Sequence, residues 1–419
     1  MAANPGASAS GRWYHGWNIV AVAIICQVAA QGLPVNTFSL FLKGWSADLG
    51  TPISTLQLGA AAFGLVSSLG SPLAGIAVDR YPARWLLIAG LTGLALLHIA
   101  VSFVTSLWQL LVLFGTLLPV SVVFSAALVT NAVLARWFVK RLGLALSLSA
   151  LGLGLAGAIL PPIIAAVMPD YGWRAVWQVA GLIILFAIIP AVVWVVRERP
   201  SASDGDYYLT GTPDAARPNV HGVADAGADT PGWREVFRRR NFWILVCAYL
   251  PLIAVHGGTL QNLAPIAASR GMSEQMAGTL LSVFSLSHLA ATFAAGMLSD
   301  RFGNRLPLFG IAMASGIGAL IIAFGQGMIA LGIGAILVGM AGGVWPLLAS
   351  ATVAEFGAAV FGRAFGLMLL FIPAIVLAPF IVARLHEAYG SYSPGLAGMA
   401  LLVLLGGGGC LSMRERQLR

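Results

Sequence analysis

The feature of this sequence that most constrains its fold is a series of long apolar runs. Each run has roughly the 20 apolar residues that an α-helix needs to cross a bilayer. Charged residues make up only 9% of the chain, against about 25% in soluble domains, so most of its surface does not face water. We therefore predict an all-α membrane protein with twelve transmembrane helices in two six-helix halves. The predicted spans are 17–41, 55–77, 85–104, 108–134, 143–167, 174–196, 242–268, 276–298, 306–325, 328–353, 364–383 and 394–413.

The distribution of Lys and Arg predicts the orientation of these spans. With both termini in the cytoplasm, all but four of the 23 basic residues fall on the cytoplasmic side, as the positive-inside rule requires. The exceptions are Lys43, Arg174, Arg270 and Arg384. Membrane anchoring therefore accounts for the net charge of +8, and we expect no nucleic-acid partner. We predict a multi-pass protein of the plasma membrane, the inner membrane if the source is bacterial.

A polar segment separates the two sets of spans. Residues 198–240 are rich in Asp, Gly, Pro, Arg and Ser and contain no apolar run. We divide the chain into an N-terminal half, 1–197, a cytoplasmic linker, 198–240, and a C-terminal half, 241–419. The linker ends in Trp233 to Phe237 followed by three arginines, a pattern typical of a short amphipathic helix on the inner leaflet. A regulatory docking site is the alternative.

Two short motifs recur in the two halves. The pattern G-x-x-x-D-R-x-x-x-R occurs at 75–84 and again at 296–305, with its aspartates 221 residues apart. A second pair has nearly the same offset: Arg136-Trp137-Phe138 precedes one span, and Ala354-Glu355-Phe356 precedes its counterpart. The sequence therefore predicts a duplicated unit of six spans.

The repeated motif resembles the loop signature of the major facilitator superfamily. This resemblance implies parallel halves with a substrate site between them near the midplane. It also implies a gate on the cytoplasmic side, where the glycines allow close helix approach and the aspartates pair with arginines or face helix N-termini. Simple topogenic charge is the alternative. The predicted gate residues are Gly75, Asp79, Arg80, Arg84, Gly296, Asp300, Arg301 and Arg305.

A further resemblance narrows the family. The segment from Trp137 to Ala145 is similar to the fifth-span signature of the monocarboxylate porter family, whose bacterial relatives include oxalate/formate antiporters. Tyr14 to Trp17 and Gly172 to Arg174 are similar to other elements of that family. The family implies proton-coupled transport of small carboxylates, with an arginine in the eighth span and, in mammalian members, a lysine in the first. Here Thr292 and Asn36 stand at those two positions.

Uncharged polar residues near the middle of the spans therefore carry the site hypothesis. His288 lies one helical turn before Thr292, so the two share a face. A protonated histidine can bind an anion, and histidine titrates in the range that suits proton coupling. The alternative is a neutral histidine bonded to a neighbouring helix. The predicted substrate-binding residues are Asn36, His256, Gln261, Asn262, His288, Thr292 and Trp345.

The sequence thus predicts a secondary active transporter of a small organic acid, with a proton as the coupling ion and rocking alternating access. A transporter or exporter of a larger aromatic or weakly charged compound is the alternative. A membrane-embedded enzyme is not expected, because no catalytic cluster is present, and an ATP-driven pump would need a phosphate-binding loop. We expect no cofactor, no metal and a monomer in the bilayer.

Overall fold

The chain is described by a computed structural model, which covers residues 14–138, 142–198, 233–356 and 364–412 except 366 and 369. This part of the chain is almost entirely helical. A helix satisfies every backbone hydrogen bond within its own segment, which is what the interior of a bilayer demands. The all-α membrane fold predicted from the apolar runs is confirmed.

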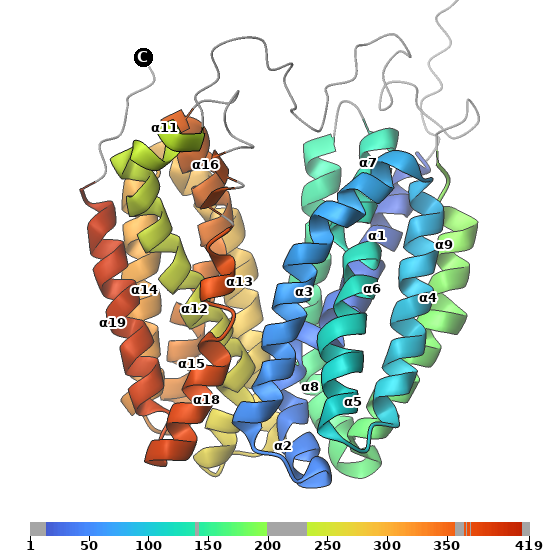
Figure 1. Cartoon of the computed structure of the whole chain (residues 1–419), viewed down its shortest axis with the longest axis horizontal. Helices are drawn as coiled ribbons and strands as arrows, with labels where there is room; N and C mark the ends of the chain where they lie inside the picture. Colours follow the sequence, from blue (N-terminus) through green and yellow to red (C-terminus); the bar gives the residue numbers. More distant parts are fainter. Residues whose placement is uncertain are drawn as a thin grey trace, which may run out of the picture.

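The helices form two bundles that lie side by side (Figure 1). The first bundle comprises α1 (Gly16–Gln31), η1 (Gly32–Asn36), α2 (Phe38–Leu49), α3 (Ile53–Arg80), α4 (Ala83–Ser102), α5 (Leu107–Val112), η2 (Leu113–Leu117), α6 (Leu118–Ser125), α7 (Ala127–Trp137), α8 (Leu142–Ile183), η3 (Ile184–Ile188) and α9 (Ile189–Val195). The second comprises α11 (Trp233–Arg238), α12 (Arg240–Ser269), α13 (Glu274–Phe302), α14 (Arg305–Phe324), α15 (Gly327–Gly339), η4 (Met340–Gly343), α16 (Val344–Phe356), η5 (Ile372–Ala374), α18 (Ala378–Tyr389) and α19 (Ser393–Cys410). Most of the predicted linker lies outside the described residues, so its boundaries stay a prediction, but α11 matches the short helix expected at its end.

Eleven described helices are long and apolar enough to cross a membrane. One of them, Leu144–Val195, has 52 residues and contains the predicted fifth and sixth spans. It bends at Gly172, whose φ of 74° and ψ of 163° are non-helical. Glycine adopts a positive φ without steric cost, so the chain can turn there. The 52-residue stretch is therefore two spans, and the prediction of twelve is confirmed.

The predicted eleventh span, 364–383, ends too early. The described residues near its predicted start are helical, but helix α18 runs on to Tyr389, with the short turn η5 before it. Pro373 lies in the first turn of η5 and Pro379 in the first turn of α18, where the missing N–H of proline is tolerated. Part of the predicted span lies outside the described residues.

The two ends of the bundles differ in which groups gather there. At one end, the top of Figure 1, α7 and α16 end and α12 begins; we call this the linker face. At the other end, the opposite face, α2 and α18 end. Lys43, Arg174 and Arg384, which the sequence places outside, pair at the opposite face with Glu274, Asp48 and Glu387 respectively.

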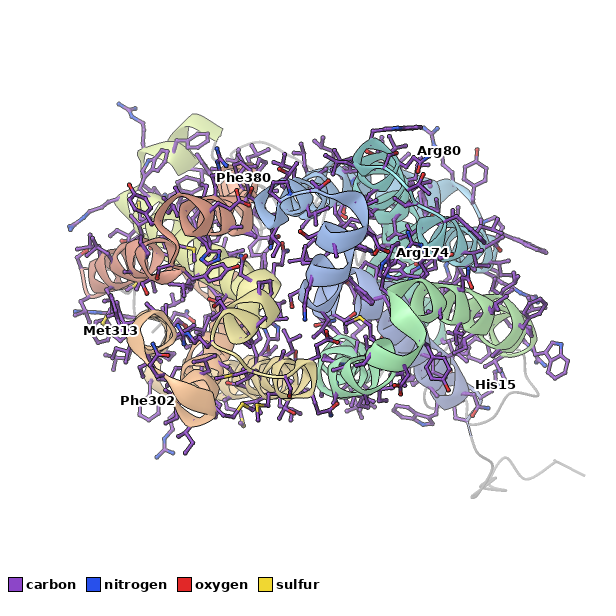
Figure 2. The ribbon with its side chains drawn as sticks, turned by 90° about the horizontal axis from the view of Figure 1, so that it is seen from below. His15, Arg80, Arg174, Phe302, Met313 and Phe380 are labelled. Atoms are coloured by element: carbon purple, nitrogen blue, oxygen red, sulfur yellow. The ribbon has the colours of Figure 1, made fainter. Side chains whose placement is uncertain are left out.

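The bundles meet mainly through α8 and α13, which adjoin along one edge when viewed from the opposite face (Figure 2). Close approach depends on glycine at this seam. A Cβ added at Gly278 would lie 2.8 Å from both the carbonyl oxygen of Pro161 and Cβ of Ala165. Small residues let membrane helices approach in this way. Because lipid tails are as apolar as the side chains, the hydrophobic effect does not drive helices together in a bilayer, and van der Waals contact stabilises their packing instead.

Candidate functional site

Two histidines face each other inside the C-terminal bundle. His256 on α12 and His288 on α13 have ring centroids 4.8 Å apart, and the Phe284 ring lies 4.8 Å from that of His256. Both imidazoles are half-buried, and the buried Nδ1 of each has no hydrogen-bond partner in the structure. A buried polar atom is costly unless it has a hydrogen-bond partner. The structure thus places side by side two residues that the sequence predicted separately as substrate-binding.

The segment that faces His288 from the neighbouring helix has an irregular backbone. The turn η4, Met340–Gly343, interrupts the helix between α15 and α16, and a Cβ at Gly342 would lie 2.6 Å from Nδ1 of His288. Thr292 donates its hydroxyl to the carbonyl oxygens of His288 at 2.8 Å and Gly342 at 3.1 Å. Thr292 therefore ties α13 to η4 and fixes the place of the imidazole.

Asn36 lies at the seam between the bundles. Its Nδ2 donates to the carbonyl oxygen of Gln31 at 3.1 Å, across the π-helical turn η1. A Cβ added at Gly157 on α8 would lie 2.7 Å from Oδ1 of Asn36 and in contact with Ser285 on α13. Because Ser285 precedes His288 by one turn, Asn36 reaches the histidine region from the other bundle.

Gln261 and Asn262, predicted to bind substrate, take part in a bridge between the bundles. Gln57 on α3 is fully buried and donates from Nε2 to the carbonyl oxygen of Gln261 at 2.9 Å and to Oδ1 of Asn262 at 3.2 Å. Asn262 in turn donates to the carbonyl oxygens of Gly258 and Pro379. The side-chain amide of Asn262 thus forms its hydrogen bonds within the protein, whereas Oε1 of Gln261 has no partner.

Gln57 was missed from the sequence. Its signal was available, because it is an amide inside an otherwise apolar run of the second span. Polar residues at membrane depth usually face a cavity or a partner helix. Only the tertiary structure reveals that the partner is α12 of the other bundle.

Trp345 lies just after η4, at the start of α16. Its side chain is 37% exposed, and among the ring contacts of the described residues it does not touch the two imidazoles. It therefore stays a predicted wall of the pathway that no contact here joins to the histidine pair.

A cavity of about 440 Å³ lies in the N-terminal bundle next to the bridge. Two interrupted helices border it: η1 contributes Pro34 and Val35, and Ala126 sits at the break between α6 and α7, with extended φ of −101° and ψ of −155°. Broken helices at membrane depth occur where they line a cavity. The other lining residues are Gln31, Ala60, Phe63, Gly64, Ser67, Ser71, Val122, Val123, Ala127, Leu128 and Gln261.

The opposite face is held together across the bundles by a carboxylate. Glu387 on α18 accepts hydrogen bonds from the backbone N–H of Ser54 at 3.0 Å and from its hydroxyl at 2.7 Å, at the start of α3. Lys43 on α2 lies 3.7 Å from Glu274 on α13. A carboxylate at a helix N-terminus is favoured by the unpaired N–H groups and the helix dipole. These contacts join the two bundles on this side.

A separate ion pair at the opposite face lies wholly within the N-terminal bundle. Asp48 pairs with Arg174 and accepts a hydrogen bond from Nε1 of Trp173 at 2.9 Å. The hydrogen bond from Arg174, followed by that from Trp173, holds the pKa of Asp48 below its usual value. This group lies beyond the first candidate span, which ends at Asn36.

The predicted gate residues lie at the linker face, where the described contacts stay within each bundle. Arg84 donates to the carbonyl oxygen of Val193 at 2.6 Å, and its backbone N–H donates to Glu198, which also pairs with Arg136. In the C-terminal bundle Arg239 lies 3.9 Å from Glu355. Arg80 and Arg301 are exposed and Arg305 is half-buried, while the side chains of Asp79 and Asp300 lie outside the described part.

The close helix approach predicted at Gly75 and Gly296 is wrong for this structure. A Cβ added at either glycine would meet nothing within 4 Å. The two glycines lie on sides of α3 and α13 that face open space, whereas other residues at the same helix ends contact α7 and α16, as the hydrogen bonds of Val78 with Arg136 and of Ser299 with Ser350 show. The glycines that do permit close approach, such as Gly157 and Gly278, lie outside the repeated motif.

Comparisons with known proteins agree with this architecture. The family model described as Major Facilitator Superfamily matches residues 20–371. The chain is 25% identical over 367 residues to the oxalate:formate antiporter of Oxalobacter formigenes, covering 85% of this chain and 80% of that protein. It is 26% identical over 410 residues to monocarboxylate transporter 11 of Mus musculus, covering 95% and 83%. Two other curated relatives are matched over only 35% and 60% of their own length.

A solved structure shares the fold. It is a bacterial homologue of the human lysosomal transporter Spinster, in an inward-facing and unoccupied conformation. The superposition gives a TM-score of 0.75 at 14% identity and covers 96% of this chain and 97% of that one. At this identity the likeness concerns the fold alone.

Proposed function

Because the chain belongs to the major facilitator superfamily, a family of transporters, we propose that it is a secondary active transporter that moves a small organic acid together with a proton. The resemblance to monocarboxylate porters and to oxalate/formate antiporters is confirmed at low identity. The names of those relatives refer to carboxylates, which supports an anionic substrate for this chain.

The observation that carries the proposal is the pair His256 and His288. In the part of the chain that the structure describes, Lys, Arg, Asp and Glu occur only towards the ends of the spans, so the pair supplies the ionisable groups at depth, apart from His98. That third histidine is fully buried, hydrogen-bonded to the carbonyl oxygen of Leu94 and packed against Trp177, with the two rings tilted by 40°. A protonated imidazole attracts a carboxylate, and losing the proton releases it. One group thus serves binding and coupling.

Alternating access follows from where the bundles touch. The contacts of Glu387 with Ser54 and of Gln57 with α12 break when the opposite face opens. The gate motifs of 75–84 and 296–305 then approach their neighbours and close the linker face, in the manner of two rigid halves rocking about a central site. We propose that the linker face is cytoplasmic, with both termini there, and that the protein is a monomer in the plasma membrane, or the inner membrane of a bacterium.

A larger aromatic or weakly charged substrate is the second candidate. The specific observation in its favour is the cavity of about 440 Å³ in the N-terminal bundle. Ligand sites of roughly 300–1,000 Å³ are typical for molecules much larger than lactate or formate.

Uptake into proteoliposomes tests the proposal. Purified protein is reconstituted and offered radiolabelled short carboxylates, aromatic acids and neutral aromatic compounds, each with and without an inward proton gradient. We expect saturable uptake of at least one acid, faster with the gradient. Uptake of neutral compounds alone would favour the second candidate, and no flux for any compound would contradict both.

A further inference from the structure

We propose that the cavity of the N-terminal bundle is a subsite for an apolar group, one aromatic ring or larger, carried by the transported organic acid. This inference rests on the proposed function and names the class of its substrate. The acid group of such a substrate lies toward the histidine pair of the C-terminal bundle, and its apolar group lies in the cavity.

The lining of the cavity is the first argument. Phe63, Val122 and Val123 supply apolar walls, and among the described residues that line it none is charged. A carboxylate moved from water into such surroundings loses its hydration without gaining a counter-charge, which is costly. The cavity therefore suits the uncharged part of a ligand.

Size is the second argument. An apolar cavity of about 150 Å³ is enough to hold benzene, and this cavity has about 440 Å³. A two- or three-carbon acid would leave most of this volume unfilled. A ring system fills it and buries apolar surface, which strengthens binding about fourfold for each methylene-sized group.

Two polar atoms of residues that line the cavity can orient a bound ligand. Oγ of Ser67 and Oε1 of Gln261 are buried and have no hydrogen-bond partner, so a ring N–H or hydroxyl group of the ligand can donate to them. Gln261 lies five residues beyond His256 on α12, about 7.5 Å along the helix axis. That rise matches one short linker between the carboxylate and the ring, and the linker must also turn about 140° around α12, because each residue adds about 100°.

The lining positions also belong to one helix face. Ala60, Ser67 and Ser71, with Phe63 and Gly64 between them, follow the three- and four-residue spacing that places side chains side by side on α3. A larger side chain at Ala60 therefore enters the cavity. Leu69 lies on the same helix and is 66% exposed, so a change there leaves the cavity untouched.

Binding of a graded ligand series tests the inference. Acetate, propionate, phenylacetate and indole-3-acetate carry the same carboxylate on an apolar group of increasing size, and neutral indole carries none. Their apparent affinities are measured by the shift in melting temperature with ligand concentration, since a ligand that binds the folded state raises its stability. The wild type is compared with Ala60→Phe and with the control Leu69→Phe.

We expect indole-3-acetate to bind at least tenfold more tightly than acetate to the wild type and to Leu69→Phe. In Ala60→Phe this preference falls below threefold while acetate binding stays the same. Val123→Phe, which fills the cavity from α6, gives the same result if Ala60→Phe does not fold.

Three other outcomes are informative. Equal affinity for all acids in the wild type, or equal weakening of acetate and indole-3-acetate by both filling variants, overturns the inference and leaves organic-acid transport standing. Binding of neutral indole as tight as indole-3-acetate, and lost in Ala60→Phe, keeps the subsite and overturns the organic-acid proposal. Binding of none of the compounds contradicts both.

Discussion

Helices α3 and α13 occupy matching places in the two bundles but present different chemistry. Counting 221 residues back from His288 and Thr292 gives Ser67 and Ser71, which line the cavity of the N-terminal bundle. The C-terminal bundle thus offers an imidazole where the N-terminal bundle offers a small hydroxyl and open space. Duplication accounts for the frame, and divergence at a few positions accounts for a polar site on one side and an apolar subsite on the other.

The polar arrangement follows the same division. Residue 35, which matches His256, is Val35 and lines the cavity. The N-terminal bundle therefore has no histidine at either matching position, and so no second imidazole pair. We infer that binding of the acid group and proton coupling belong to the C-terminal bundle alone, while the N-terminal bundle selects the rest of the substrate.

The largest expected effect comes from removing the imidazoles. His256→Ala and His288→Ala should each lower the initial rate of acid uptake at least tenfold, because a hydrogen bond to a charged group contributes about 1.5–3 kcal/mol. Ser67→Ala and Ser71→Ala should change the rate for acetate less than twofold. Equal losses of rate in the histidine and serine variants would contradict the inference that only the C-terminal bundle binds the acid group. The measurement is the rate per folded protein in proteoliposomes.

The closure of the opposite face is the next test. Glu387→Gln weakens the contact with Ser54 between the bundles, so the closed state should lose about 1.5–3 kcal/mol. A second cavity, of about 370 Å³, lies between the bundles at this face, and the buried Ser39 lines it. Labelling of Ser39→Cys by a maleimide should become at least several-fold faster, in a background without the native cysteines. Asp48→Asn removes a charge at the same face within one bundle and should leave the labelling rate unchanged. A rate unaffected by Glu387→Gln would show that the contact does not hold the bundles.

The seam between the bundles can be tested with one substitution at two places on α13. Gly278→Ala puts a methyl group against Pro161 and Ala165 and should destabilise the protein by about 1–3 kcal/mol. Gly296→Ala meets open space and should leave the melting temperature unchanged or raise it slightly, because alanine favours helix. A larger loss at Gly296 than at Gly278 would mean that the predicted close approach at the gate motif exists after all.

The smallest effect concerns the ion pair of Asp48 and Arg174. The pKa of Asp48 is lowered in the folded protein, so the pair stabilises it above the usual carboxyl pKa, and that stabilisation is lost as the pH falls through the folded value. At pH 7, Asp48→Asn should lower the free energy of unfolding by no more than about 1 kcal/mol, because the pair is exposed. The melting temperature should fall only slightly. The difference from the wild type should shrink as the pH falls below the usual carboxyl pKa and should vanish only below the lowered pKa of the folded protein. A difference that persists at low pH would point to packing.

Much of the fold was predictable because hydropathy and helix length are local properties. The apolar runs, the break at Gly172 between two spans and the equivalence of 75–84 with 296–305 can all be read from neighbouring residues. The end of the eleventh span was placed too early because Arg384, His386 and Glu387 end the apolar run, whereas the helix continues to Tyr389. The gate motif was identified, but its close packing depends on the conformational state, which no local pattern records.

The site was only partly predictable. His256 and His288 stand out as ionisable residues in apolar runs, yet their pairing across two helices could be seen only in the structure. The cavity had no local signal at Ala126, because alanine gives no hint of an extended residue inside a helix. Gln57 was visible as a polar residue, but its partners Gln261 and Asn262 belong to the other bundle, more than 200 residues away.

The most direct test of this account is acid uptake driven by a proton gradient in proteoliposomes. Wild-type protein, the double variant His256→Gln/His288→Gln and the matched variant Ser67→Ala/Ser71→Ala are compared with and without an inward gradient. We predict that the gradient accelerates uptake by the wild type and by the serine variant, and that it has no effect on the residual uptake of the histidine variant. Acceleration of the histidine variant equal to that of the wild type would contradict the assignment of proton coupling to the C-terminal bundle.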